Sequence, residues 1–245
     1  MNRAIFFATM RSGFGPLTDI QVQVAEAILD AAALKKLSAQ HTAYILATGW
    51  GEAKLTPVRE NMSYTVARIR QVWPSRPEAV RFARKPKPLA NSVYGGRLGN
   101  LPGTDDGWNF RGGGIDQLTG RANYGKIGIV YQPDEILQPG RAVASIMHGM
   151  TTGRYTGRKL ADYGDGAGFD ARAARAIVNG DVRLNGAKYA AFHQVFMRAI
   201  IEAGGVGHVT ETPKPEHVAP VVLPPAPSFW AGIIAALVAF FTRGK

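Results

Sequence analysis

Apolar and polar residues alternate along most of this chain with the period of an α-helix. In residues 19–37 the apolar side chains recur three and four positions apart, as they do in an amphipathic helix, and Thr18 precedes them as a helix cap. The same period predicts further helices at residues 39–52, 64–72, 79–84, 139–148, 171–178 and 187–203. Runs that alternate with a period of two are few and short. The pattern therefore predicts a mainly α-helical domain.

The helical pattern is interrupted by long stretches rich in glycine. Residues 94–114 are rich in Gly, Asn and Asp and are predicted to be mainly loop, and the Lys-Pro-Lys-Pro sequence at residues 85–88 is interpreted as the end of the preceding helix. Long loops in a compact domain are more often functional than idle. The apolar run at residues 4–10 has no Ala-x-Ala cleavage site after it, so we interpret it as part of the fold and not as a signal peptide.

The composition changes after Thr212. Residues 213–228 contain six prolines in 16 positions, which is typical of a semi-rigid spacer. Residues 229–241 are an uncharged apolar run, followed by Arg243 and Lys245. A helix over residues 229–242 would be about 21 Å long, shorter than the ~30 Å core of a bilayer. We expect a catalytic domain at 1–212, a linker at 213–228 and a hydrophobic C-terminal helix within a tail, 229–245, that associates with the inner membrane.

Composition and charge narrow the possible partners. The chain has no cysteine, which excludes disulfides, thiol catalysis and cysteine-bound metals. Its net charge of +11 favours polyanions such as nucleic acid, anionic lipid or an anionic cell wall, although a solvated basic surface without a partner is the alternative. No nucleic-acid module is recognisable, so no nucleic-acid partner is expected. We expect a monomer.

Two possible cofactor motifs fail on inspection. Residues 120–127 have the G-x4-G-K skeleton of a phosphate-binding loop, but Ile127 stands where Ser or Thr should follow. The five histidines lie far apart and none has the spacing of a metal site. We therefore expect neither a metal nor another cofactor.

Glu52 and Glu60, eight residues apart, are the candidates for acid and base. On its helix Glu52 shares a face with Ile45, Thr48 and Gly49, so an apolar wall with room beside it would raise its pKa, as a general acid requires. Glu60 follows a proline turn among polar residues and is expected to stay ionised, as a base requires. Inverting glycoside hydrolysis uses such a pair. The alternative is two unrelated surface carboxylates.

Residues 43–76, 93–100 and 106–124, which include GWGEAKLTPVREN and FRGGGIDQLTGRANY, resemble glycoside hydrolase family 19, in particular its branch of phage lysins and bacterial lysozyme-like enzymes. The resemblance continues through residues 159–180. It implies a lysozyme-like helical fold and hydrolysis, with inversion, of β-1,4 bonds next to N-acetylated amino sugars in peptidoglycan or chitin. It assigns the general acid to Glu52 and the activation of water to Glu60. It also implies substrate contacts by Gln117, Thr119, Asn123, Tyr124 and Asn179.

The resemblance is not complete, and it leaves alternatives open. Gly51 replaces the family's usual His, Gly113 its usual Arg, and Asp116 its usual Ile. Gln117 and Asn123 could instead satisfy loop backbone groups, and Asn179 could be only a helix cap. We predict a peptidoglycan-degrading endolysin, made in the cytoplasm without a cleavable signal and held at the membrane by its tail. A chitinase, or a catalytically weak protein that binds the wall or perturbs the membrane, is the alternative.

Overall fold

The computed structural model describes residues 1–205, and within them the protein is mainly helical, which confirms the predicted fold class. The α-helices are α1 (Arg3–Phe14), α2 (Asp19–Leu34), α3 (Ala39–Ala53), α4 (Val66–Val72), α5 (Pro86–Tyr94), α6 (Asp106–Asn109), α7 (Arg121–Lys126), α8 (Pro139–Thr152) and α9 (Val182–Glu202). The 3-10 helices are η1 (Pro77–Phe82), η2 (Pro133–Leu137), η3 (Leu160–Tyr163), η4 (Gly166–Gly168) and η5 (Ala173–Ile177). Strands β1 (Val58–Arg59) and β2 (Gly113–Gly114) pair antiparallel, with Val58 opposite Gly114.

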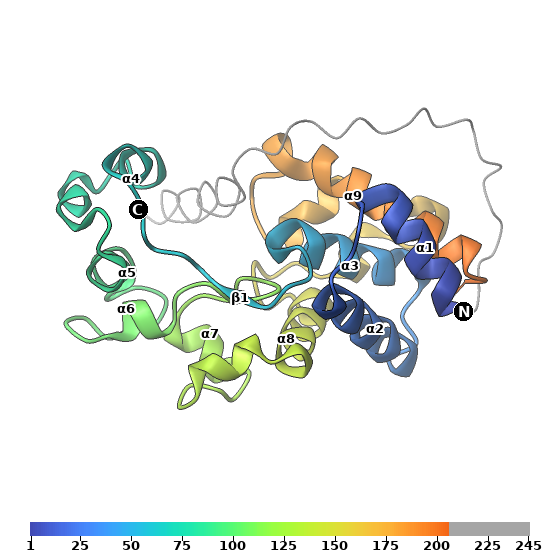
Figure 1. Ribbon diagram of the computed structural model, residues 1–245, viewed down its shortest axis with the longest axis horizontal. Coiled ribbons are helices and arrows are strands. Elements are labelled where there is room, and N and C mark those ends of the chain that lie inside the picture. Colours follow the sequence, from blue (N-terminus) through green and yellow to red (C-terminus); the bar gives the residue numbers. More distant parts are fainter. Residues whose placement is uncertain (206–245) are drawn as a thin grey trace.

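Helix α3 is the centre of the larger lobe. It packs along α9 and also contacts α2 and α8, and α1 packs on α9 as well (Figure 1). Nearly every residue of α3 is buried because neighbours cover it on all sides. Trp50 near its end stacks on Phe14 of α1, with ring centroids 4.3 Å apart. The acid candidate therefore projects from the most enclosed helix of the protein.

A smaller lobe is built from α4, η1, α5 and α6 (Figure 1). It has an apolar cluster of its own, in which Ile69, Trp73, Leu89 and Tyr94 are buried. The β1–β2 pair lies where the chain passes between the two lobes (Figure 1). Glu60 comes directly after β1, so the two glutamates belong to different parts of the fold.

The ends of the helices follow from local chemistry, with one correction. The hydroxyl of Ser38 accepts the N–H of His41 and caps α3, which ends at Lys54 in the left-handed conformation (φ 52°). The Lys-Pro-Lys-Pro sequence follows the end of η1 at Phe82, as predicted, but it also begins a helix that was not predicted, because α5 starts at Pro86. Proline lacks the N–H that the first helical turn leaves unused, and its fixed φ suits that position.

The predicted membrane localisation requires correction. Across residues 1–205, no helix combines the length and the apolar character needed to cross a bilayer. No described residue supports the membrane association predicted through residues 229–242. The predicted linker and tail fall outside the described residues.

Candidate active site

Glu52 occupies the last turn of α3 and is only 3% exposed. Its Oε1 accepts a hydrogen bond from the Arg175 guanidinium, supplied by η5, and another of 2.6 Å from the Tyr189 hydroxyl of α9. No described residue donates to its Oε2. The expected apolar wall is thus wrong, because a cation and a phenol contributed by the C-terminal third of the chain occupy that side of the carboxylate.

Arg175 connects Glu52 to a second buried carboxylate. It is 1% exposed, its Nε donates to Asp181 Oδ1 over 2.7 Å, and its guanidinium lies 4.1 Å from the centroid of the Tyr189 ring. Asn185 also donates to Asp181, over 2.6 Å. Buried charges are tolerated only when such hydrogen bonds compensate them. The network therefore fixes the orientation of the Glu52 carboxylate.

Glu60 is 4% exposed and is surrounded by tyrosines of the smaller lobe. The Tyr94 hydroxyl donates to its Oε2 over 2.9 Å, the Tyr64 hydroxyl donates to Oε1 over 3.3 Å, and the Gly112 N–H donates over 3.4 Å. Burial raises the pKa of Glu60, although these three hydrogen bonds act in the opposite direction. Glu60 was expected among polar residues, and the structure buries its carboxylate against the hydroxyls of Tyr64 and Tyr94.

Gln117 lies beside Glu60 and has an acceptor without a partner. Its Nε2 donates to the carbonyls of Val58 and Gly114, over 3.2 and 2.9 Å, whereas its buried Oε1 meets no donor among the described residues. A Cβ placed on Gly112 would lie 2.9 Å from that Oε1 and 3.4 Å from Glu60 Oε2, so both oxygens border Gly112. Gln117 also has a φ of 51°, which is uncommon outside glycine. A buried acceptor of this kind is typical of a site that binds a donor.

Asn179 has the same property. It is buried in the segment after η5, four residues beyond Arg175, and its N–H donates to the Arg175 carbonyl over 3.0 Å. Its buried Oδ1 has no donor in the described part of the chain. The backbone bond does not use the side chain, so a capping role alone does not account for this carboxamide.

Thr119 and Asn123 support the loop that carries Gln117. The Thr119 hydroxyl donates to the Gln117 carbonyl over 3.0 Å, and Asn123 Nδ2 donates to the Thr119 carbonyl over 2.8 Å. Tyr124 is fully buried, and its hydroxyl accepts from Arg59 and donates to the Arg111 carbonyl. These contacts give Asn123 and Tyr124 a structural role in shaping the loop.

The replacement of histidine by Gly51 has a visible consequence. A Cβ on Gly51 would lie 2.4 Å from Tyr189 Cε1 and 2.8 Å from its hydroxyl oxygen, a separation that real structures do not allow. Tyr189 therefore occupies the space that a side chain at position 51 would need. From there its hydroxyl donates a hydrogen bond to Glu52.

Asp116 is likewise explained by its partners. It is buried and accepts hydrogen bonds from Ser145, Tyr155 and Arg154, at 2.6, 2.7 and 3.1 Å. Burial raises the pKa of Asp116, whereas Arg154 lowers it. Asp116 thus links the glycine-rich loop to α8 through polar contacts, whereas the pattern of glycoside hydrolase family 19 has isoleucine at this position. Among residues 1–205 no group of three or more His, Asp or Glu side chains is placed to hold a metal ion.

Sequence reasoning missed the side chains that hold the two glutamates, which are Arg175 and Tyr189 for Glu52 and Tyr64 and Tyr94 for Glu60. Arg175 and Tyr189 lie more than a hundred positions from Glu52, and no short motif contains both ends of such a contact. Only the departure at Gly51 gave a signal, since a missing side chain next to the acid invites a replacement from elsewhere.

Comparison with known proteins supports the resemblance over part of the chain. A segment of 71 residues is 38% identical to a Haemophilus influenzae protein described as "Glycosyl hydrolase family 19 domain-containing protein". The match covers 27% of this chain and 36% of that protein, so this chain spans about a third of the relative's length. No family model matches the chain.

Proposed function

We propose that this protein is a glycoside hydrolase that cleaves β-1,4 bonds between N-acetylated amino sugars of peptidoglycan, acting as a lytic enzyme of the endolysin type. One observation carries the proposal: two glutamates are each buried and held by dedicated donors in different parts of the fold. Buried carboxylates are rare unless they are paired, and a buried carboxylate with a shifted pKa is a candidate for catalysis. The partial similarity to a family 19 glycosyl hydrolase supports the same conclusion.

In the proposed mechanism Glu52 takes up a proton at its free Oε2 when the substrate binds and donates it to the leaving glycosidic oxygen. Both donors that hold the side chain go to Oε1, so Oε2 is the oxygen that can carry this proton. Arg175 and Tyr189 then stabilise the carboxylate that remains after the transfer, because they donate hydrogen bonds to it. General acid catalysis of this kind contributes roughly 10²–10⁴ in rate.

Glu60 activates the attacking water in this mechanism. Its raised pKa suits the role, because a carboxylate is a stronger base as its pKa moves towards the working pH. Tyr64 and Tyr94 keep the carboxylate oriented. The neighbouring Oε1 of Gln117 is a second acceptor that would hold the water or an N–H of the sugar.

The substrate class follows from the acceptors and from the charge. N-acetylated sugars carry amide N–H and hydroxyl donors, and the free oxygens of Gln117 and Asn179 are suited to accept from them. The net charge of +11 favours an anionic polymer. Peptidoglycan has both properties, whereas chitin has only the first. The monomeric state stays a prediction.

The test is the release of reducing ends from purified peptidoglycan. We expect Glu52→Gln and Glu60→Gln each to lose at least about a hundredfold in rate, since each removes a proton-transfer group. Glu26→Gln removes an exposed glutamate of α2 and serves as the matched control, with an unchanged rate. Glu52→Gln acting as fast as wild type would overturn the acid assignment. A wild type that binds the wall without releasing ends would identify a non-catalytic wall-binding protein.

A further inference from the structure

Two lysines lie next to Glu52 and share one aromatic ring. Lys54 Nζ lies 5.1 Å from the centroid of the Phe192 ring and 4.9 Å from that of Trp50. Lys188 Nζ lies 5.7 Å from the centroid of the same Phe192 ring. The two ammonium groups thus converge on one side chain of α9, although they come from the end of α3 and from α9.

These lysines have no carboxylate partner. Within residues 1–205 neither ammonium forms a hydrogen bond or an ion pair, whereas Lys87 pairs with Asp105 and Arg121 pairs with Asp106. The surrounding rings desolvate Lys54 and lower its pKa, and the charge of Lys188 lowers it further. Burial lowers the pKa of Lys188 as well, against the attraction of Glu52. Two partly desolvated like charges repel each other, so an anion placed between them would be stabilised.

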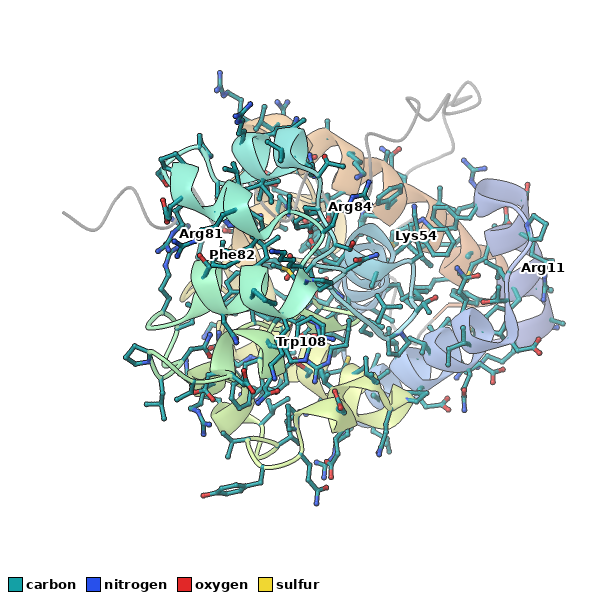
Figure 2. All side chains as sticks on the ribbon, turned by 60° about the vertical axis from the view of Figure 1, so that its left-hand side comes forward. Arg11, Lys54, Arg81, Phe82, Arg84 and Trp108 are labelled. Carbon is teal, nitrogen blue, oxygen red and sulfur yellow. The ribbon has the colours of Figure 1, made fainter. Side chains whose placement is uncertain are left out.

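Their position relative to the proposed acid is fixed by the backbone. Lys54 follows Glu52 by two residues, and Lys188 directly precedes Tyr189, whose hydroxyl bonds to Glu52. Figure 2 labels Lys54 next to the end of α3, and Arg84 on the segment between η1 and α5. Lys54 and Arg84 are both exposed. A sugar chain that reaches Glu52 therefore passes close to the lysine pair.

We propose that Lys54 and Lys188 bind a carboxylate of the substrate, and that they thereby select a muramic-acid-type sugar over a neutral one. This inference rests on the proposed hydrolase function. Peptidoglycan carries a lactyl ether and peptide carboxylates on alternate sugars, whereas a polymer of N-acetylglucosamine carries no charge. The lysine pair is thus a specificity determinant beside the acid, and no step of the hydrolysis passes through it.

Binding measurements test this role without depending on turnover. In the Glu52→Gln background, we would measure the affinity for three probes: soluble peptidoglycan strands with free carboxylates, the same strands with their carboxylates amidated, and chitotetraose. Lys54→Gln with Lys188→Gln should weaken binding of the free-carboxylate strands about tenfold, which is about 1.4 kcal/mol, because both charge contacts with the carboxylate are lost. Affinity for the amidated strands and for chitotetraose should change by less than about twofold.

Two controls separate a local effect from a general one. Lys35→Gln with Lys126→Gln removes the same charge from two exposed positions on α2's end and α7, and should leave all three affinities unchanged. Lys54→Arg with Lys188→Arg keeps the charge and should keep the preference for free carboxylates. Equal losses on all three probes, or no loss on any, would overturn the proposal. Failure of the proposed function is seen separately, as a wild type that releases no reducing ends although these binding differences persist.

Discussion

Replacing Arg175 should destabilise the fold strongly. Its side chain is 1% exposed and forms hydrogen bonds with two buried carboxylates, Glu52 and Asp181. In Arg175→Met both carboxylates stay buried without a counter-charge. Breaking a buried ion pair from one side costs about 3–5 kcal/mol, which is a large fraction of the ~5–15 kcal/mol that stabilises a typical domain. We expect the free energy of unfolding at pH 7 to fall by about 4 kcal/mol.

Urea unfolding followed by circular dichroism measures this quantity. Arg198→Met, at an exposed position of α9, is the matched control and should change the free energy of unfolding by less than about 0.5 kcal/mol. Arg175→Met combined with Glu52→Gln should recover part of the loss, because one of the two unpaired charges is then absent. A loss below about 1 kcal/mol, or a double variant no more stable than Arg175→Met, would refute the reasoning that Arg175 neutralises Glu52.

Three further predictions concern pH and packing. Burial lowers the pKa of His193 to about 4, so the unfolded state binds the proton more readily than the folded state. The free energy of unfolding should therefore fall as the pH falls from about 6.5 towards 4. Unfolding curves should show that His193→Leu loses less of this free energy over the same range, by up to about 3 kcal/mol. The raised pKa of Glu60 gives the opposite pH dependence, because the stability that this group contributes is lost as the pH rises through that pKa. Glu60→Gln should therefore have a higher melting temperature than wild type at pH 7, and a smaller advantage near pH 4. Gly51→Ala should displace Tyr189 and lower the free energy of unfolding by about 1–3 kcal/mol, whereas Gly140→Ala, with nothing within 4 Å of its added Cβ, should not.

Helices α2 and α3 of the larger lobe could be predicted because their sequence pattern is local. Residues 19–37 and 39–52 show the apolar spacing of helices, and the structure has α2 and α3 there, with ends within a few residues of those predicted. Helix α5 was missed because its prolines were interpreted as breakers, although proline in the first turn is compatible with a helix. Residues 171–178 form only the short 3-10 helix η5 where a regular helix was predicted.

The environments of the two glutamates could not be predicted, because distant segments determine them. The neighbours of Glu52 on its own helix suggested an apolar wall, whereas Arg175 and Tyr189 arrive from η5 and α9. Nothing local to Glu60 showed that Tyr64 and Tyr94 would enclose it. The burial of Asp116 against Arg154 is likewise a contact between separate segments.

The stereochemistry of the first product tests the two-carboxylate account most directly. Hydrolysis in which Glu60 activates a water on the face opposite the leaving group inverts the anomeric carbon. Proton NMR during the first turnovers on a β-1,4-linked chito-oligosaccharide should therefore show the α-anomer before mutarotation sets in. The β-anomer appearing first would contradict the account, because it would require Glu60 to attack the sugar itself or another group to act in its place.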